Sequence, residues 1–140
     1  MSRIKLPIPS QFHYSTQLQL RIYDMNYGSH MGNDSVLSIV HEARIRFLAS
    51  INAEEKNFYG LSLLMADSAI VYKKEAFYGE LLEIKISVSE IYSHGFKLFY
   101  LISNVVNDLE IARITTGMVC CDPVTKKINR LPKKFAHKFS

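Results

Sequence analysis

The stretch DMNYGSHMGNDSVLSIVHEARIRFLASI, residues 24–51, decides the fold. In its second part, apolar residues recur at spacings of three and four, as at Val36, Val40 and Phe47, which is the period of an amphipathic helix. Polar residues that commonly cap helices stand just before this pattern. The pattern therefore predicts a helix of about five turns over 34–51, with a wide apolar stripe that belongs at the centre of its domain.

Alternation of apolar and polar residues, which is typical of half-buried strands, occurs on both sides of this helix. Leu18 and Leu20 share one face of the stretch 16–24. After a connector at 52–60, four further segments alternate, and turns this short between the last three require antiparallel neighbours. The four segments are 66–73, 81–91, 96–106 and 109–121. The sequence thus predicts an α+β domain in which one helix packs on a curved antiparallel sheet.

The segment 96–106 differs from the others because it is apolar on both faces, with Leu98 on one face and Phe99 on the other. In a domain this small, one helix covers only one face of a sheet. We therefore expect a second copy of the chain to cover the other face, and hence a homo-oligomer.

Composition places the chain among ordinary globular proteins, since 48% of its 140 residues are hydrophobic and 21% are charged. We expect a single domain over 1–140. No apolar run approaches the ~20 residues that a bilayer requires, so we expect a cytoplasmic protein without membrane insertion. The adjacent Cys120 and Cys121 form no disulfide framework and supply too few ligands for zinc, so no metal and no cofactor is expected.

Positive charge is concentrated at the end of the chain. Six of the 17 lysines and arginines lie in the tail 126–140, which contains no acidic residue. Such a tail attracts anions, among them the phosphates of a coenzyme, or it is simply a solvated surface. The chain contains no known nucleic-acid-binding motif, so no nucleic-acid partner is expected.

The element order, the loop at 24–34 and the motif at 41–44 resemble the hotdog-fold acyl-CoA thioesterases, in the branch that includes 4-hydroxybenzoyl-CoA thioesterase. An acidic-Pro turn at 122–123 and a Leu-Pro pair at 131–132 extend the resemblance, which covers about 18–135. It implies a hotdog fold, with one long central helix wrapped by a curved antiparallel sheet of about five strands. It also implies hydrolysis of an acyl-CoA thioester in a homodimer whose sheets join edge to edge, or in a homotetramer, with coenzyme A as part of the substrate and no other cofactor.

The resemblance also indicates a site at the start of the helix. In the family, amide groups there polarise the thioester carbonyl, which points to Gly32 and Asn33, and a carboxylate in the preceding loop is catalytic. Asn26 occupies that carboxylate's position. An amide neither attacks as a carboxylate nor takes a proton from water at neutral pH. The alternative function is therefore a hotdog module that binds acyl-CoA or acyl carrier protein without hydrolysing it, and a hotdog dehydratase is a weaker third.

Three other acids are candidates to activate water, each with a structural alternative. Asp34 is the first candidate and otherwise an ordinary N-cap. Glu42, on the helix, is the second and otherwise a partner for Arg46 one turn on. Asp24 is the third, and otherwise a buried acid that holds the loop through backbone hydrogen bonds. His30 either orients water or the thioester, together with Asn26, or only bridges the loop.

In the basic tail, three cations are candidates to bind the phosphates of coenzyme A. They are Lys126, Lys127 and Arg130.

Overall fold

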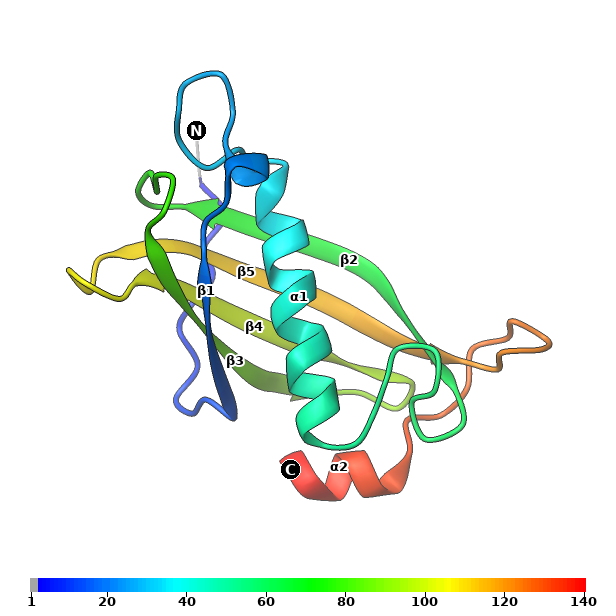
Figure 1. The fold of residues 1–140 in the computed structure, drawn as a ribbon. Helices are drawn as coiled ribbons and strands as arrows, with labels where there is room; N and C mark the ends of the chain where they lie inside the picture. Colours follow the sequence, from blue (N-terminus) through cyan, green and yellow to red (C-terminus); the bar gives the residue numbers. More distant parts are fainter. Residues whose placement is uncertain (1–2) are drawn as a thin grey trace.

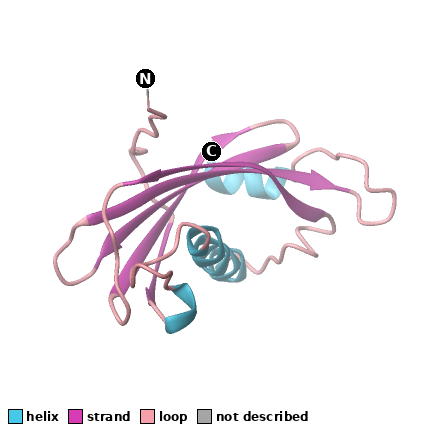
Figure 2. Ribbon diagram, turned by 90° about the horizontal axis from the view of Figure 1, so that it is seen from above, coloured by secondary structure: helices cyan, strands magenta, loops and turns pink. Residues whose placement is uncertain are grey.

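The computed structural model describes residues 3–140 as a five-stranded antiparallel sheet that curves around one helix (Figures 1 and 2). The strand order is β1-β3-β4-β5-β2, so β1 and β2 form the two edges. The elements are β1 (Tyr14–Gln19), the 3-10 helix η1 (Ile22–Asp24), α1 (Ser35–Ser50), β2 (Ser62–Tyr72), β3 (Leu81–Ile91), β4 (Gly95–Asn104), β5 (Glu110–Cys121) and α2 (Lys133–Phe139). The α+β class and the β3-β4-β5 meander predicted from the sequence are confirmed.

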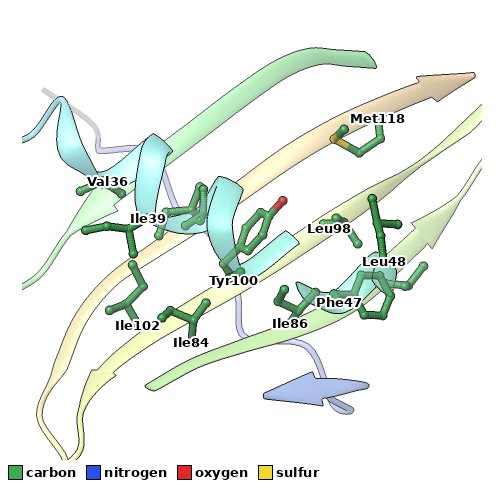
Figure 3. Close-up of a cluster of buried hydrophobic side chains, with 14 of the residues drawn as sticks. Val36, Ile39, Phe47, Leu48, Ile84, Ile86, Leu98, Tyr100, Ile102 and Met118 are labelled. Atoms are coloured by element: carbon green, nitrogen blue, oxygen red, sulfur yellow. The ribbon is translucent and has the colours of Figure 1, made fainter. Parts of the chain in front are cut away.

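The helix α1 fills the hollow of the sheet. It has 16 residues, so it begins one residue later and ends one residue earlier than the predicted helix over 34–51, and it is shorter than the five turns expected. Figure 3 shows its apolar side chains, among them Val36, Ile39 and Phe47, directed at the sheet. They meet fully buried side chains of β3 and β4 such as Ile84 and Tyr100. Burial of these surfaces is the main stabilising contribution to the fold.

The first strand is shorter than predicted. β1 ends at Gln19, whereas alternation suggested a strand over 16–24. The reason is a tight turn, in which the Asp24 carboxylate accepts a hydrogen bond from the Arg21 N–H at 2.8 Å and closes the 3-10 helix. As a result Ile22 is 67% exposed, although the alternation placed it with the leucines.

The predicted strand 66–73 is also displaced, because β2 begins earlier, at Ser62, and ends at Tyr72. A bulge between Met65 and Asp67 shifts its register against β5. Such an extra residue breaks the period-two pattern, which explains why alternation alone missed the first four residues of the 11-residue strand. The strand 81–91 has the predicted bounds.

The outer face of β4 is covered in part by the chain itself. Phe99, on that face, is 2% exposed, and its ring lies 6.3 Å from the ring of Phe12 in the segment before β1. The guanidinium of Arg113 donates to the Leu6 carbonyl at 3.0 Å and fixes this segment on the sheet. Figure 2 shows the start of the chain on the side of the sheet opposite α1. Phe99 is therefore buried without a second copy, while Val105, at the end of the predicted strand, stays 39% exposed. The homo-oligomer itself stays a prediction.

The basic tail does not run freely over the surface but ends in the helix α2. Phe135 is fully buried, with its ring centroid 4.4 Å from that of Phe96 and 5.1 Å from that of Phe58. The three lysines of α2, at positions 133, 134 and 138, remain exposed. α2 therefore closes one end of the core beneath α1, and the expected tail is a docked amphipathic helix (Figure 1).

One buried polar network ties α1 to its surroundings. Arg44 is 5% exposed and donates to a Glu55 carboxylate oxygen at 2.9 Å and to the Tyr100 hydroxyl at 3.0 Å. That hydroxyl lies 2.8 Å from Thr116 Oγ1, and His41 Nε2 lies 2.7 Å from the second Glu55 oxygen. Burial opposes ionisation of Glu55, but the hydrogen bonds from His41 and Arg44 outweigh it and lower the pKa of this carboxyl. The arginine of the His-Glu-Ala-Arg motif thus has a structural role.

Within residues 3–140, no helix is long and apolar enough to cross a membrane.

Candidate active site

The loop that precedes α1 is held in place by backbone bonds on two sides. Met25 pairs with Met31 across the loop, and His30 pairs with Phe77 in the segment between β2 and β3. The Met31 N–H donates to the Ala76 carbonyl at 2.6 Å. The position of the loop is therefore fixed by contact with residues 76–77 as well as by the start of α1.

Asn26 organises this loop through its side-chain oxygen. Asn26 Oδ1 accepts hydrogen bonds from the N–H groups of Gly28, at 2.8 Å, and His30, at 3.4 Å. A carboxylate at this position would accept the same two bonds. The loop is thus compatible with either an amide or an acid at position 26, and the difference between them is chemical rather than geometric.

Asp34 and Asn26 approach each other over Gly32. A Cβ atom on Gly32 would lie 2.6 Å from Asp34 Oδ1 and 3.6 Å from the Asn26 Cβ. Asp34 stands at the N-cap position of α1, but its side chain accepts no capping hydrogen bond from the described residues. Both side chains line a cleft of about 470 Å³, together with Tyr23 and Tyr27. Asp34 therefore presents an uncommitted, exposed carboxylate beside Asn26.

Of the two predicted amide donors, the structure leaves one available. The Gly32 N–H donates to the Asp24 carbonyl at 2.8 Å, so it is already engaged. The N–H of Asn33 has no hydrogen-bond partner among residues 3–140. Asn33 stands one residue before the N-cap Asp34, so its N–H lies near the positive end of the dipole of α1. Of the two predicted donors, the Asn33 N–H is therefore the one without a partner in residues 3–140.

His30 lines a second hollow beside the loop. Its Nδ1 lies 3.1 Å from the Met31 carbonyl oxygen, which assigns the proton of the neutral ring to Nδ1. Its Nε2 is 3.7 Å from a carboxylate oxygen of Glu75. The hollow, of about 230 Å³, is also lined by Asn33 and Tyr72. His30 and Asp34 thus line two different hollows near the start of α1.

Glu42 and Asp24 lie in a separate cleft of about 210 Å³ between β1 and α1. Arg46 Nε donates to the Glu42 carboxylate at 2.8 Å, while Arg46 Nη1 donates to the Gln17 carbonyl at 2.8 Å. The Asp24 carboxylate is buried against the Arg21 N–H. Glu42 and Asp24 thus make the contacts expected of structural acids, namely an ion pair with Arg46 and a backbone hydrogen bond within the loop.

The three cations proposed for phosphate binding lie away from this loop. Lys126, Lys127 and Arg130 belong to the turn after β5, at the opposite end of the sheet from residues 25–34 (Figure 1). Backbone N–H groups in this turn donate to the Asp122 carboxylate, whose pKa they lower. Within one chain, these cations do not reach the start of α1.

The sequence reasoning did not single out the segment 72–75. Tyr72, Lys73 and Lys74 line the hollow of His30, and the Tyr72 hydroxyl donates to the Asn33 carbonyl at 3.3 Å. The available signal was a pair of lysines at the end of the predicted strand 66–73. The pairing of His30 with Phe77 and the bond from the Met31 N–H to the Ala76 carbonyl bring these lysines to the loop before α1.

The two cysteines are buried in β5. Burial raises the pKa of the Cys120 thiol to about 11, with a further contribution from Cys121, so this thiol is protonated at neutral pH and unsuited to attack a thioester. No group of three His, Cys, Asp or Glu side chains in residues 3–140 is placed to hold a metal ion.

One central helix held in the hollow of a curved five-stranded antiparallel sheet is the arrangement of the hotdog fold. The chain belongs to the thioesterase-like superfamily, whose family profile matches residues 20–139. No curated protein matches it in sequence.

Solved structures with the same fold include thioesterases from several bacteria. The 1,4-dihydroxy-2-naphthoyl-CoA thioesterase of Synechocystis superposes with a TM-score of 0.82 at 21% identity, covering 90% of this chain and 94% of that one. The DHNA-CoA thioesterase of Staphylococcus aureus gives 0.78 at 19% identity, with 89% and 84% covered. The probable thioesterase YbaW of Escherichia coli gives 0.74 at 20% identity, with 90% and 96% covered. At these identities the likeness establishes the fold.

Proposed function

We propose that the protein hydrolyses an acyl-CoA thioester to the free acid and coenzyme A, with Asp34 as the base that activates water. The observation that carries this proposal is the position of the Asp34 carboxylate, which is free of capping bonds and lies beside Asn26 at the start of α1. Membership of the thioesterase-like superfamily supports the reaction class.

The chemistry requires three groups around the thioester carbonyl. Water attacks the carbonyl carbon while its proton passes to Asp34. The resulting oxyanion accepts a hydrogen bond from the Asn33 N–H at the positive end of α1. The carbon–sulfur bond then breaks, and the leaving thiolate recovers the proton from Asp34. Asn26 orients the water or the carbonyl with its amide, a role that needs no charge.

Asp34 is preferred over the other two acids because of their contacts. Glu42 is paired with Arg46, and Asp24 is buried and bonded to the Arg21 N–H. Using either as a base would break an existing interaction, whereas Asp34 has none to lose.

The direct test is release of free thiol from a panel of short, long and aromatic acyl-CoAs. The panel includes 1,4-dihydroxy-2-naphthoyl-CoA, because two structural neighbours carry that activity in their names. Asp34→Asn should lower kcat by about 10²-fold or more, while Glu42→Gln, as a matched acid-to-amide control, should leave most of it. Equal losses in the two variants, or a loss only in Glu42→Gln, would reject Asp34 as the base.

A second candidate function follows from Asn26. Because the family's acid is replaced by an amide, the fold is also suited to bind an acyl-CoA or an acyl carrier protein without hydrolysis. That protein would be protected thermally by acyl-CoA and would release no thiol. Since the loop accepts an acid at position 26 without change in its hydrogen bonds, Asn26→Asp should then gain hydrolysis.

We propose further that the protein is a homodimer whose sheets join through β2. This strand is 11 residues long, lies at a sheet edge and exposes Leu64 and Met65 by 52% and 44%. Long apolar edges of this kind are rarely left unpaired. Light scattering should give twice the chain mass, or four times for a tetramer. Leu64→Lys should lower that mass and Gln17→Lys, on the opposite edge strand β1, should not; a monomer at micromolar concentration would refute the proposal.

A further inference from the structure

Two adjacent lysines form a fixed cationic corner at the end of β2. The N–H groups of Lys73 and Lys74 both donate to the Ile111 carbonyl, at 2.8 and 3.1 Å, which anchors their backbone to β5. Both side chains are exposed, and neither takes part in an ion pair within residues 3–140. Their charges are therefore available to an anion from outside the chain.

Three hollows of the surface meet at this corner. Lys73 lines the hollow of His30, a second hollow of about 460 Å³ beside Asn104, and a groove of about 610 Å³ along residues 3–7. Tyr72 lines both the hollow of His30 and the groove. Because the Tyr72 hydroxyl is bonded to the Asn33 carbonyl, a ligand that passes Tyr72 connects the groove with the start of α1.

The groove combines apolar walls with free positive charge. Ile4 and Pro7 are among its apolar lining residues, and Arg3 and Lys5 add two cations to that of Lys73. A fourth cation, Arg113, is already paired with Glu110 and bonded to the Leu6 carbonyl. It therefore holds the wall of the groove in place and is not counted among the cations that would bind a ligand. A surface of this kind suits a ligand that carries both a planar aromatic ring and several phosphates.

We propose that the corner of Lys73 and Lys74, together with the groove of residues 3–7, binds the phosphorylated nucleotide end of an acyl-CoA. The thioester arm would run past Tyr72 to Asn33 and Asp34. This inference rests on the proposed function and names the residues that recognise its substrate. It differs from the sequence-based assignment to Lys126, Lys127 and Arg130, which lie at the other end of the sheet within the same chain.

The kinetic test compares two thioesters of one acyl group, one of coenzyme A and one of pantetheine, which lacks the nucleotide. Lys73→Ala/Lys74→Ala should raise KM for the CoA thioester by about tenfold or more and leave KM for the pantetheine thioester unchanged. The matched control is Lys133→Ala/Lys134→Ala, a second exposed lysine pair, which should change neither constant. An unchanged KM for the CoA thioester in the first variant, or an equal rise for both thioesters, would overturn the proposal.

A binding measurement separates this proposal from the proposed hydrolysis. Calorimetry with coenzyme A alone should give a Kd that weakens with added salt and weakens about tenfold or more in Lys73→Ala/Lys74→Ala. If wild type binds coenzyme A in this way but releases no thiol from any thioester, the hydrolysis proposal fails and the nucleotide site stands. If wild type hydrolyses CoA and pantetheine thioesters with equal KM and shows no binding of coenzyme A, the nucleotide site fails and hydrolysis stands.

Discussion

The carboxylate of Asp34 lies over the backbone of Gly32 so closely that a methyl group on Gly32 would come within 2.6 Å of Asp34 Oδ1. Gly32 does not adopt a positive φ, so its backbone conformation is open to any residue. The glycine is therefore required by the neighbouring side chain and not by the turn. The proposed base, Asp34, can hold this position because residue 32 has no side chain.

Gly32→Ala should consequently reduce activity more than stability. The added methyl group pushes the Asp34 side chain aside, because an approach of 2.6 Å is too close for real Cβ contacts. Misplacing a base by about 1 Å costs up to ~10²-fold in rate, so we expect kcat to fall by at least about tenfold. The midpoint of thermal unfolding should change little, since Asp34 is exposed and able to move. Unchanged kcat in a folded variant would argue against Asp34 as the base.

Phe135→Ala should strongly destabilise the protein. Phe135 is fully buried among Phe58, Phe96 and Phe139, with centroid distances of 4.4–5.1 Å. Truncation of a buried phenylalanine costs about 3–5 kcal/mol in the free energy of unfolding. Urea denaturation measures this change, and Lys134→Ala, on the exposed face of α2, should stay within about 0.5 kcal/mol of wild type. Similar values for the two variants would mean that α2 is not docked in solution.

These elements show which features of the fold are readable from the sequence. β3 has the bounds that alternation predicts, because it is a central strand whose side chains alternate between the core and the outer face. α2 was missed because its lysines dominate the composition of the tail, although Phe135 and Phe139 stand at the helical spacing of four. The contact by which Phe12 covers Phe99 could not be predicted from the sequence, because it joins residues far apart in the chain.

The same distinction holds for the candidate site. Asn26, Asn33 and Asp34 are close in sequence, so a loop followed by a helix brings them together by local geometry. The cationic corner depends instead on the pairing of residues 30 and 77 and on the path of residues 3–7 across the sheet. Local sequence thus brings together the groups that we propose to react, while the surface proposed to recognise the rest of a substrate arises from tertiary contacts.

Arg44→Ala should destabilise the protein much more than Arg46→Ala, although both arginines belong to α1. Loss of Arg44 leaves the Glu55 carboxylate with His41 as its remaining partner and removes a bond to the buried Tyr100 hydroxyl. Breaking a buried pair in this way costs about 3–5 kcal/mol. Arg46 pairs with the half-exposed Glu42, and solvent screening reduces the contribution of such pairs to about 1 kcal/mol or less. Equal free energies of unfolding for the two variants, measured in urea, would contradict a structural role for the buried network.

Stability should fall as the pH is lowered through the titration of His13. His13 Nδ1 accepts a hydrogen bond from the Val88 N–H at 3.0 Å, and the ring packs edge-on against Phe139 at 5.2 Å. Burial lowers the pKa of His13 below the 6.5 of an unfolded chain. Just below pH 6.5 the unfolded chain therefore binds this proton and the folded chain does not. The contribution of His13 to the free energy of unfolding is thus complete above that pH and decreases as the pH falls below it.

The variant that isolates this effect is His13→Asn, because an asparagine oxygen can accept the Val88 N–H without titrating. Unfolding by urea between about pH 5.5 and 7.5 should show a shallower dependence on pH in His13→Asn than in wild type. His94→Asn, which alters an exposed histidine in the turn between β3 and β4, should keep the wild-type slope. Identical slopes for wild type and His13→Asn would show that the folded state does not hold His13 neutral, and that its bond to Val88 contributes nothing to the acid sensitivity of the fold.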